Sequence, residues 1–367
     1  MKIAYIVLKG MPLGGGIEKY TEEIGSRLAR MGHDITVYVM PHYGGIDGEY
    51  KGMRIRAVPT VRRKSIEKLA ASFVASAVQI FENDVDIVHM HAFGPAMFGF
   101  IPRWQGRKVV TQGHGLEWKR SKWNWFGRAF LKATEIPSVR CSHAMTAVSR
   151  VQQEYIHERY RRDCVYLPTG VNPPCLEKPD RIRHLGLDGQ DYILFAARLV
   201  QEKGAHYLIE AYNRLNTDVK LVIAGDAEHE QRYKTDLRSL AKSNGKIIFP
   251  GFVTGKELHE LFTNCRFFVL PSEIEGLPTA LLEAMSYGNC VLASDIPENR
   301  EALCGYGYTF KNMDVTDLAE RLLYLLSHAD AVNLYKKKAQ DHVLANHSWD
   351  AIAEQFERFY KGLLNYD

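Results

Sequence analysis

The sequence lacks long hydrophobic runs and paired cysteines. No apolar stretch in its 367 residues approaches the ~18 residues that a membrane-spanning helix needs. The first apolar stretch, residues 3–8, is shorter than the ~7–15-residue core of a secretory signal peptide. The six cysteines show no Cys-x-x-Cys spacing, which disfavours a zinc site or a disulfide framework. We therefore expect a cytoplasmic protein with reduced cysteines.

Negative charge is scarce in the first half of the chain. Residues 1–173 contain 25 Lys or Arg and 15 Asp or Glu, whereas residues 174–367 contain 22 and 28. The halves therefore carry net charges of +10 and −6. This asymmetry indicates an anionic partner for the first half, and nucleic acid, an anionic membrane surface and a phosphorylated substrate all stay open. A chance excess of solvated Lys and Arg would give the same count.

The remaining composition is typical of a globular protein, with 46% apolar and 25% charged residues. Short β-branched apolar runs alternate with helical patterns, which predicts βαβ units and parallel sheets. The expected strands are residues 2–8, 34–40, 54–58, 86–90, 108–111, 144–148, 164–167, 192–196, 219–224, 247–249, 267–270 and 290–293. The expected helices include residues 17–31, 65–81, 124–141, 151–160, 204–215, 315–327, 331–345 and 350–364.

The alternation is interrupted by a proline-rich join near residues 169–179 and then restarts. We therefore predict two doubly wound α/β domains facing a cleft, with ligands beyond the carboxyl ends of the strands. The predicted boundaries are residues 1–172 for the first domain, 173–347 for the second and 348–367 for a carboxy-terminal helix.

A glycine-rich turn follows the first strand. Gly14, Gly15 and Gly16 precede a helix, so a ligand can approach the backbone near a positive helix end. Neither the Gly-x-Gly-x-x-Gly fingerprint nor a P-loop is present. We predict that Gly15 and Gly16 bind part of the donor substrate, although a simple tight turn would also use glycine.

Two cations follow the first strand of the second half. Arg198 and Lys203 lie in a turn at the predicted carboxyl edge of the sheet. A planar guanidinium and a point charge there can hold a diphosphate, whereas two solvated surface cations are the alternative.

The most specific signal is the segment of residues 271–285, which follows a predicted strand. Pro278 suits the start of a helix, and the N–H groups around Leu277, Pro278 and Thr279 would then form an anion site. Glu275 lies in the preceding loop, and Glu283 lies two turns into the helix. These carboxylates can accept hydrogen bonds from sugar hydroxyls.

These motifs together resemble glycosyltransferase family 4, the retaining enzymes that use nucleotide sugars. The resemblance spans nearly the whole chain and rests on Glu275-x7-Glu283, the Arg198/Lys203 turn, glycines 14–16 and Thr169-Gly170-Val171-Asn172. Ala197 and Thr169 depart from the family's usual Gly and Asn. The resemblance implies the GT-B fold of two Rossmann-like domains, with the last helix crossing back to the first domain.

The resemblance also implies roles for single residues. Arg198 and Lys203 would bind the donor diphosphate, Glu275 the transferred sugar and Glu283 the ribose. Pro250 and Gly251 lie in a turn that resembles the family's base-binding edge. No metal or other cofactor is expected.

The first half adds a histidine between two glycines at a predicted strand end. His114 would hydrogen-bond the transferred sugar, although a lone histidine is more often structural. Residues 115–120 resemble the same segment of family members that build bacterial cell-envelope polysaccharides, and we predict that Glu117 and Trp118 bind the acceptor. A salt bridge from Glu117 to Lys119 or Arg120 is an equal alternative.

Two patterns suggest a metal, and both are disfavoured. Asp84 and Asp86 form an Asp-x-Asp motif, but it precedes a strand, at the edge opposite the expected ligands. His89 and His91 alternate along that strand without an evident third ligand.

Residues 103–132 form a basic segment with eight Lys or Arg and one Glu. It also holds Trp104, Trp118, Trp123 and Trp125, and Phe126, Phe130 and Leu131 follow at helical spacing. Such a mixture is typical of a helix lying on an anionic membrane surface, here the inner leaflet. The alternative is that Trp123, Trp125 and Phe130 pack into the domain core.

The sequence therefore predicts a metal-independent retaining hexosyltransferase. Its partners would be a nucleoside-diphosphate sugar and a glycan or lipid-diphosphate-linked acceptor of polysaccharide synthesis, and not nucleic acid. Front-side attack is expected, because no nucleophile is evident. The alternatives are an epimerase or phosphorylase of the same fold, or a non-catalytic module that binds sugar or nucleic acid.

Overall fold

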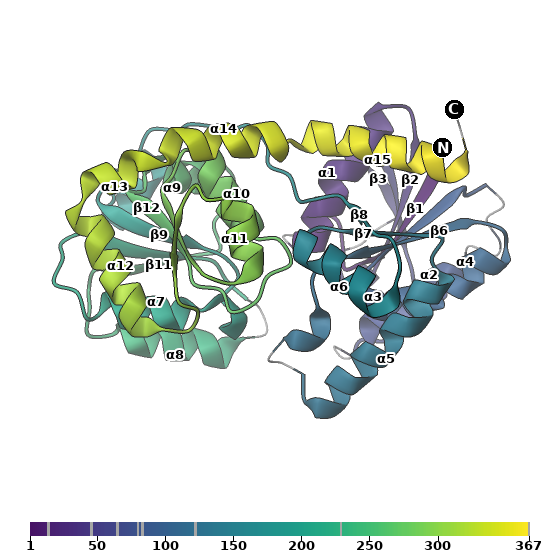
Figure 1. The fold of residues 1–367 in the computed structure, drawn as a ribbon, viewed down its shortest axis with the longest axis horizontal. Coiled ribbons are helices and arrows are strands. Elements are labelled where there is room, and N and C mark those ends of the chain that lie inside the picture. The colour runs from purple at the N-terminus through teal and green to yellow at the C-terminus, as the bar shows by residue number, and fades with distance from the viewer. Residues whose placement is uncertain are drawn as a thin grey trace. The chain divides into compact units, whose positions relative to one another are not determined.

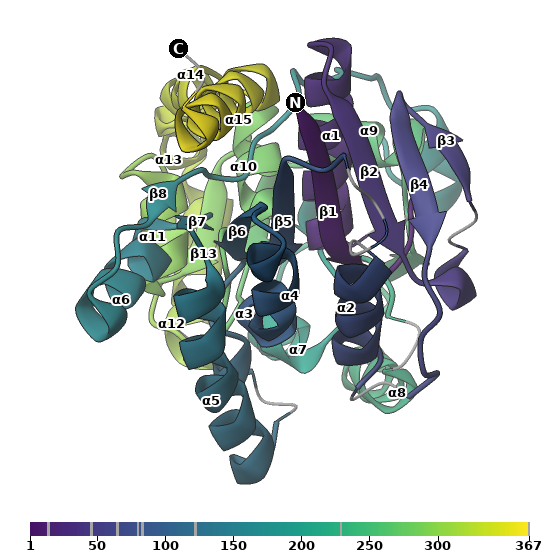
Figure 2. The same cartoon turned by 90° about the vertical axis from the view of Figure 1, so that its right-hand side faces the viewer.

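The computed structural model of the chain divides into two compact units (Figures 1 and 2). It describes residues 1–12, 15–44, 47–63, 66–78, 81, 84–120, 123–227 and 230–365. The first unit comprises Met1–Gly170 and Trp349–Asp367, and the second comprises Val171–Ser348.

The first unit is built on an eight-stranded sheet with the order β3-β4-β2-β1-β5-β6-β7-β8. Its neighbouring strands are parallel, except that β3 is antiparallel to β4. The strands are β1 (Lys2–Leu8), β2 (Asp34–Val39), β3 (Gly48–Tyr50), β4 (Met53–Ala57), β5 (Ile87–His91), β6 (Lys108–Gly113), β7 (Ala144–Ala147) and β8 (Val165–Tyr166). All of β5 is buried, as expected for a central strand that helices cover on both faces.

Helices cover this sheet on both faces. They are α1 (Gly16–Arg30), α2 (Glu67–Val78), α3 (Phe93–Ala96), α4 (Phe100–Trp104), α5 (Trp125–Cys141), α6 (Arg150–Tyr160) and α15 (Trp349–Leu364). Short 3₁₀ turns include Glu117–Lys119.

The second unit is built on a six-stranded parallel sheet with the order β11-β10-β9-β12-β13-β14. The strands are β9 (Tyr192–Ala196), β10 (Lys220–Ala224), β11 (Ile247–Gly251), β12 (Phe267–Leu270), β13 (Val291–Ser294) and β14 (Tyr308–Phe310). The helices are α7 (Ala205–Tyr212), α8 (Gln231–Ala241), α9 (Gly255–Asn264), α10 (Thr279–Ser286), α11 (Pro297–Leu303), α12 (Val315–Ser327), α13 (Ala329–Leu334) and α14 (Lys336–Asn346). The strand order reverses direction between β9 and β12, where doubly wound sheets bind ligands.

The last helix of the chain packs on the first unit beside α1, as Figure 1 shows. Its buried residues recur at helical spacing and are Trp349, Ile352, Ala353, Phe356 and Tyr360. A Cβ on Gly170 would lie 2.6 Å from the Trp349 ring, so glycine allows this close approach. The predicted fold class is therefore confirmed, including the return of the final helix.

Candidate active site

The carboxyl edge of the second sheet is shaped by two glycines with positive φ. A Cβ on Gly204 (φ +70°) would lie 2.0 Å from the Pro271 carbonyl oxygen. A Cβ on Gly225 (φ +142°) would lie 1.9 Å from the Ala197 carbonyl oxygen. The turns after β9, β10 and β12 therefore approach one another more closely than any side chain would allow.

This close approach brings two predicted site residues into contact. Lys203 Nζ lies 2.5 Å from Glu275 Oε1, and their side chains are only 17% and 7% exposed. The same two turns are joined by a hydrogen bond from the Glu273 N–H to the Glu202 carbonyl oxygen, at 2.9 Å. Arg198 is exposed and has no side-chain partner among the residues that the structure describes. The site thus holds one paired and one unpaired cation.

Helix α10 begins at this edge. Pro278 is its N-cap, and Thr279 is its first residue. The first N–H groups of a helix have no partner within it, so they favour anions. Leu277 is buried just before the helix, and Glu283 lies half-buried on its second turn.

A small hollow of about 120 Å³ lies at the same edge, beyond β10 and β11. Gly251, with φ +83°, lines it together with Phe249 and Leu199. Asp226, also in the lining, pairs with Lys234 at 2.6 Å, which lowers the pKa of the Asp226 carboxyl. Pro250 precedes Gly251 in β11, so the predicted base-binding turn borders this hollow.

In the first unit, the glycine turn contains a carboxylate that the sequence analysis missed. Gly15 is the N-cap of α1, and a Cβ there would lie 1.9 Å from Glu18 Oε2. The other Glu18 oxygen accepts the Lys9 N–H at 3.1 Å. Gly16 has open space around its missing Cβ, whereas Gly14 lies outside the described residues. The buried Glu18 makes the start of α1 less favourable for a phosphate than predicted.

His114 follows β6 and is half-buried. Its Nε2 lies 2.8 Å from Nδ1 of His91, the last residue of β5. The Tyr20 ring stands edge-on to the His114 ring, with centroids 5.2 Å apart. Burial, with smaller contributions from the neighbouring His89 and Lys68, lowers the pKa of His114 to about 3. His114 is therefore a neutral imidazole at physiological pH.

A second chain of hydrogen bonds passes through His89, which is fully buried. His89 Nε2 lies 2.9 Å from Gln112 Oε1, and Nδ1 lies 2.7 Å from the Tyr360 hydroxyl. That hydroxyl lies 3.1 Å from the Tyr5 hydroxyl. Burial lowers the pKa of His89 to about 3 and that of His91 well below its usual value.

Two side chains clamp the loop after His114. The Gln152 amide exchanges two 3.3 Å hydrogen bonds with the backbone of Gly115. Glu135, which is 2% exposed, accepts the Trp118 Nε1–H at 3.0 Å. The Lys132 ammonium covers the Trp118 ring at 4.0 Å. Trp118 is therefore fixed in place rather than free to rotate.

Glu117 forms an ion pair with Arg120 at 3.2 Å. This is one of the two predicted alternatives for Glu117. Both side chains stay partly exposed, so the pair contributes little to stability.

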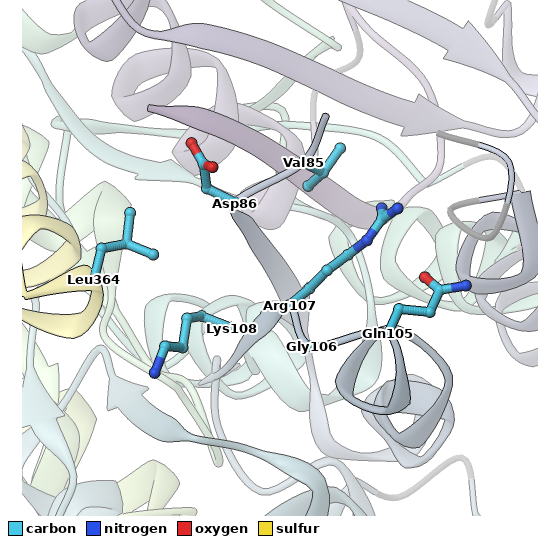
Figure 3. A pocket seen from close by; sticks show the side chains of 7 residues that line it. All are labelled: Val85, Asp86, Gln105, Gly106, Arg107, Lys108 and Leu364. Atoms are coloured by element: carbon cyan, nitrogen blue, oxygen red, sulfur yellow. The ribbon is translucent and has the colours of Figure 1, made fainter. Parts of the chain in front are cut away.

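Of the two metal-like patterns, His89 and His91 belong to the histidine cluster described above, and the Asp84/Asp86 motif lies at the opposite edge of the sheet. Lys2 contacts both Asp84, at 3.0 Å, and Asp86, through its backbone N–H at 2.7 Å. Figure 3 shows the adjoining hollow of about 530 Å³, lined by Asp86, Arg107, Lys108 and Leu364 among others. It lies at the amino ends of β5 and β6, opposite the edge where such sheets bind ligands. Among the residues that the structure describes, no group of three or more His, Cys, Asp or Glu is placed to hold a metal ion.

Comparisons with known proteins agree with this architecture. Residues 14–173 match the family described as Glycosyltransferase Family 4, and residues 177–342 match Glycosyl transferases group 1. An uncharacterized glycosyltransferase of Methanocaldococcus jannaschii is 27% identical, with 98% of each chain covered.

A second relative is the UDP-Gal:alpha-D-GlcNAc-diphosphoundecaprenol alpha-1,3-galactosyltransferase of Escherichia coli. It is 26% identical, with 82% of this chain and 80% of that one covered. The solved structure of sucrose-phosphate synthase from Thermosynechococcus elongatus has a TM-score of 0.85 at 20% identity and covers 100% of both chains, which supports the fold. The chain belongs to glycosyltransferase family 4, whose members have the GT-B fold and transfer sugars from nucleotide-sugar donors with retention of configuration.

Proposed function

We propose that this enzyme transfers a hexosyl group to a lipid-diphosphate-linked acceptor in cell-envelope polysaccharide synthesis, at the inner leaflet of the membrane. The observation that carries the acceptor proposal is the exposed aromatic and basic face of α5. The galactosyltransferase relative, whose name specifies a sugar linked to diphosphoundecaprenol, supports it.

The donor would bind to the second unit. Lys203 contacts Glu275, which lies four residues before α10, and Arg198 precedes Lys203 in the same turn, so two cations and the first N–H groups of α10 could bind one diphosphate. The bound diphosphate would compete with Glu275 for Lys203. A carboxylate released in this way can accept a hydrogen bond from the transferred sugar. Glu283 would bind the ribose, and Pro250 and Gly251 would border the base.

The reaction would proceed by front-side attack. The acceptor oxygen forms a bond to the anomeric carbon, while the bond from that carbon to the diphosphate oxygen breaks. The acceptor proton passes to the departing diphosphate. Arg198, Lys203 and the first N–H groups of α10 would stabilise the charge that develops on this leaving group, which is usually the largest contribution to catalysis.

Helix α5 presents apolar side chains on an exposed face. Trp125 is 80% exposed, Phe126 65% and Phe130 44%. Arg128 and Lys132 are exposed beside them. The amino-terminal end of α5 projects from the rest of its unit in both views (Figures 1 and 2). The alternative that Trp123, Trp125 and Phe130 pack into the core is therefore wrong for Trp125 and Phe130, whereas Trp123 is half-buried.

Not every aromatic and basic residue of the predicted membrane-binding segment, residues 103–132, belongs to this exposed face. Trp118 is held by Glu135, and Trp123 is half-buried, so neither is a freely exposed anchor. Trp104 is 92% exposed but lies on α4, near the far end of α5, where Arg103 bonds to the Cys141 carbonyl oxygen. Lys122 lies outside the described residues. Within the described residues, every helix is too short or too polar to span a bilayer.

Membrane binding through α5 would combine apolar insertion with charge. Each Lys or Arg near an anionic surface contributes about 1 kcal/mol, so a few suffice for reversible association. Aromatic side chains on an exposed helix face can enter the headgroup layer. An acceptor carried on a lipid diphosphate would then meet the enzyme at the membrane surface.

Co-sedimentation with liposomes tests this proposal. Binding should increase with the anionic lipid fraction and decrease with salt. It should fall strongly in a Trp125→Ser/Phe126→Ser variant and in an Arg128→Ser/Lys119→Ser variant. The matched control is Arg63→Ser, which removes an exposed cation of the same unit far from α5 in sequence. Equal binding to neutral and anionic liposomes, or an equal loss in the control, contradicts a role for α5.

A separate assay tests the transfer itself. A thermal-shift panel of nucleoside-diphosphate sugars first identifies the donor, because a ligand at ~100 times its Kd adds ~2.7 kcal/mol. That donor is then incubated with a polyprenyl-diphosphate sugar, with a soluble glucan or alone. Product on the lipid-linked sugar supports the proposal, and product on the glucan alone contradicts it. A new nucleotide sugar formed from the donor alone indicates an epimerase.

A further inference from the structure

His114 ends a chain of hydrogen bonds that starts inside helix α1. The Thr21 hydroxyl donates to the Ile17 carbonyl oxygen at 3.0 Å. Thr21 Oγ1 also lies 2.9 Å from His91 Nε2. His91 Nδ1 in turn lies 2.8 Å from His114 Nε2. Thr21 and His91 are both 0% exposed, so this chain of direct contacts lies in the protein interior.

The position of each proton in the chain follows from a simple count. A hydroxyl has one proton, and we assign that of Thr21 to the bond with the carbonyl oxygen four residues earlier, as helical threonines commonly do. Thr21 Oγ1 therefore accepts from His91, which places the His91 proton on Nε2. A neutral imidazole carries one N–H, so His91 Nδ1 is a bare acceptor. His114 must then donate from Nε2, and its own Nδ1 carries no proton.

His114 Nδ1 has no hydrogen-bond partner among the described residues. The Tyr20 ring, edge-on at 5.2 Å, and the bond to His91 restrict rotation of the imidazole. The unprotonated nitrogen is thus held in a fixed orientation at a half-buried position. A fixed acceptor of this kind suits a hydroxyl that donates a proton, and it repels an oxyanion.

We propose that Thr21 and His91 act as positioning residues that hold His114 in its Nε2–H tautomer, so that Nδ1 selects a sugar hydroxyl as hydrogen-bond donor. This inference rests on the proposed role of His114 in binding the transferred sugar. It assigns a task to two buried polar residues of the first unit that do not contact the substrate themselves.

The choice of tautomer has a consequence for substrate selection. A hydroxyl can donate to Nδ1, whereas fluorine in its place can only accept and hydrogen can do neither. Donor analogues with fluorine or hydrogen in place of the contacted hydroxyl should therefore have similar kcat/KM values. Both values should be lower than that of the natural donor, on the order of ten- to hundredfold. If His114 carried its proton on Nδ1 instead, the fluoro analogue would retain part of the interaction.

The tautomer can be measured in the ligand-free protein by nitrogen NMR of ¹⁵N-histidine-labelled enzyme. The two ring nitrogens give separate shifts when protonated and bare. His114→Gln and His91→Gln variants assign the two signals. We expect both histidines as Nε2–H tautomers between pH 5 and pH 8. An Nδ1–H tautomer or an imidazolium at His114 overturns the proposal, whatever the enzyme transfers.

Thr21→Val and Thr21→Ser provide a matched pair. Valine keeps the shape but leaves the buried His91 Nε2–H without an acceptor, so the His91 proton should move to Nδ1 and the His114 proton should follow. Serine keeps the hydroxyl and should keep the wild-type tautomers. If the valine variant does not fold, the serine variant and the wild-type spectrum still decide. Unchanged tautomers in a folded valine variant would overturn the proposal that Thr21 and His91 set the tautomer of His114.

Kinetics with the identified donor and its monodeoxy and deoxyfluoro analogues complete the test. In wild type, the fluoro and deoxy analogues should have similar kcat/KM values. In Thr21→Val, the kcat/KM of the fluoro analogue should exceed that of the deoxy analogue by about tenfold, mainly through kcat. If Thr21 had a purely structural role, the substitution would lower kcat/KM for all three donors by the same factor. If the enzyme transfers a sugar from none of the donors, the proposed function is wrong. The NMR measurement still tests the tautomer of His114 independently.

Discussion

Acidification should destabilise the first unit through its buried histidines. His89 and His91 are both 0% exposed, and burial lowers both pKa values, that of His89 to about 3. In the unfolded chain each has a pKa of about 6.5. Between these values the unfolded state binds more protons than the folded state, so stability is fully present above pH 6.5 and is lost as the pH falls.

The size of the effect follows from proton linkage. From pH 7.5 to pH 5, protonation of His89 in the unfolded chain alone should lower the free energy of unfolding by about 2 kcal/mol. His91 acts in the same direction and with similar size. Together they would remove about 4 kcal/mol, a large share of the 5–15 kcal/mol that stabilises a typical domain.

Tryptophan fluorescence provides a selective probe of this loss. The sequence contains five tryptophans, and all of them belong to the first unit, including Trp349 of α15. Urea unfolding followed by fluorescence at several pH values therefore reports on that unit. In His89→Asn, the loss between pH 7.5 and pH 5 should shrink by about 2 kcal/mol.

The control is His157→Gln, which removes an exposed histidine of the same unit. It should leave the pH dependence unchanged. The quantity compared is the change in the free energy of unfolding with pH. A loss of stability that is the same at every pH in His89→Asn therefore does not affect the comparison. An equal slope in the wild type and in a His89→Asn/His91→Asn variant would refute the reasoning.

Four further outcomes are expected. Arg198→Ala and Lys203→Ala should each lower turnover by ~10²–10³ in a steady-state assay; near-normal activity in both contradicts the donor site. Of the two, only Lys203→Ala should also lower thermal stability, by about 1–3 kcal/mol, because it leaves the buried Glu275 unpaired. Activity should survive dialysis against excess EDTA; a loss that Mg²⁺ restores would argue for a metal. Gly204→Ala should destabilise the second unit by more than about 1 kcal/mol in chemical denaturation, because its Cβ would collide with the Pro271 carbonyl.

The expected effect of Lys203→Ala on stability differs from what the sequence alone predicts. The turn after β9 reads as an exposed loop, so neither cation appears important for folding. In the structure, only Arg198 is exposed, whereas Lys203 is 17% exposed and bonded to Glu275. The two paired residues are 72 positions apart, and their contact depends on glycines that allow two turns to meet. The spacing of these residues along the chain does not predict that Lys203 and Glu275 are in contact.

The fold was predictable where hydrophobic periodicity is strong. The buried parallel strands and long amphipathic helices lie within a few residues of their predicted positions. The short helices α3 and α4 were missed because each contains a proline, at Pro95 and Pro102, and reads as a loop. The edge strand β3 was missed because it is three residues long and largely exposed. Tertiary packing, rather than local preference, stabilises such elements.

The histidine cluster was only partly predictable. The alternation of His89 and His91 was evident, and so was the position of His114 at a strand end. Their contact follows from the register of β5 and β6, in which His91 lies opposite Gln112. Tyr360, which bonds to His89, is 271 residues away and belongs to the returning helix α15. Only the folded chain shows that the cluster is closed by its own carboxy-terminal segment.

In the proposed site, the two units would therefore present different chemistry to a substrate. The second unit presents charge, since Arg198 is exposed and Lys203 is shared with a carboxylate. With the proposed tautomer, the first unit would present a neutral acceptor at His114. Three neighbouring imidazoles cost stability in acid, and apolar side chains in the same strands would avoid that cost. What imidazoles supply instead is fixed hydrogen-bond polarity, and this is the property that discriminates one hydroxyl of a sugar from its absence.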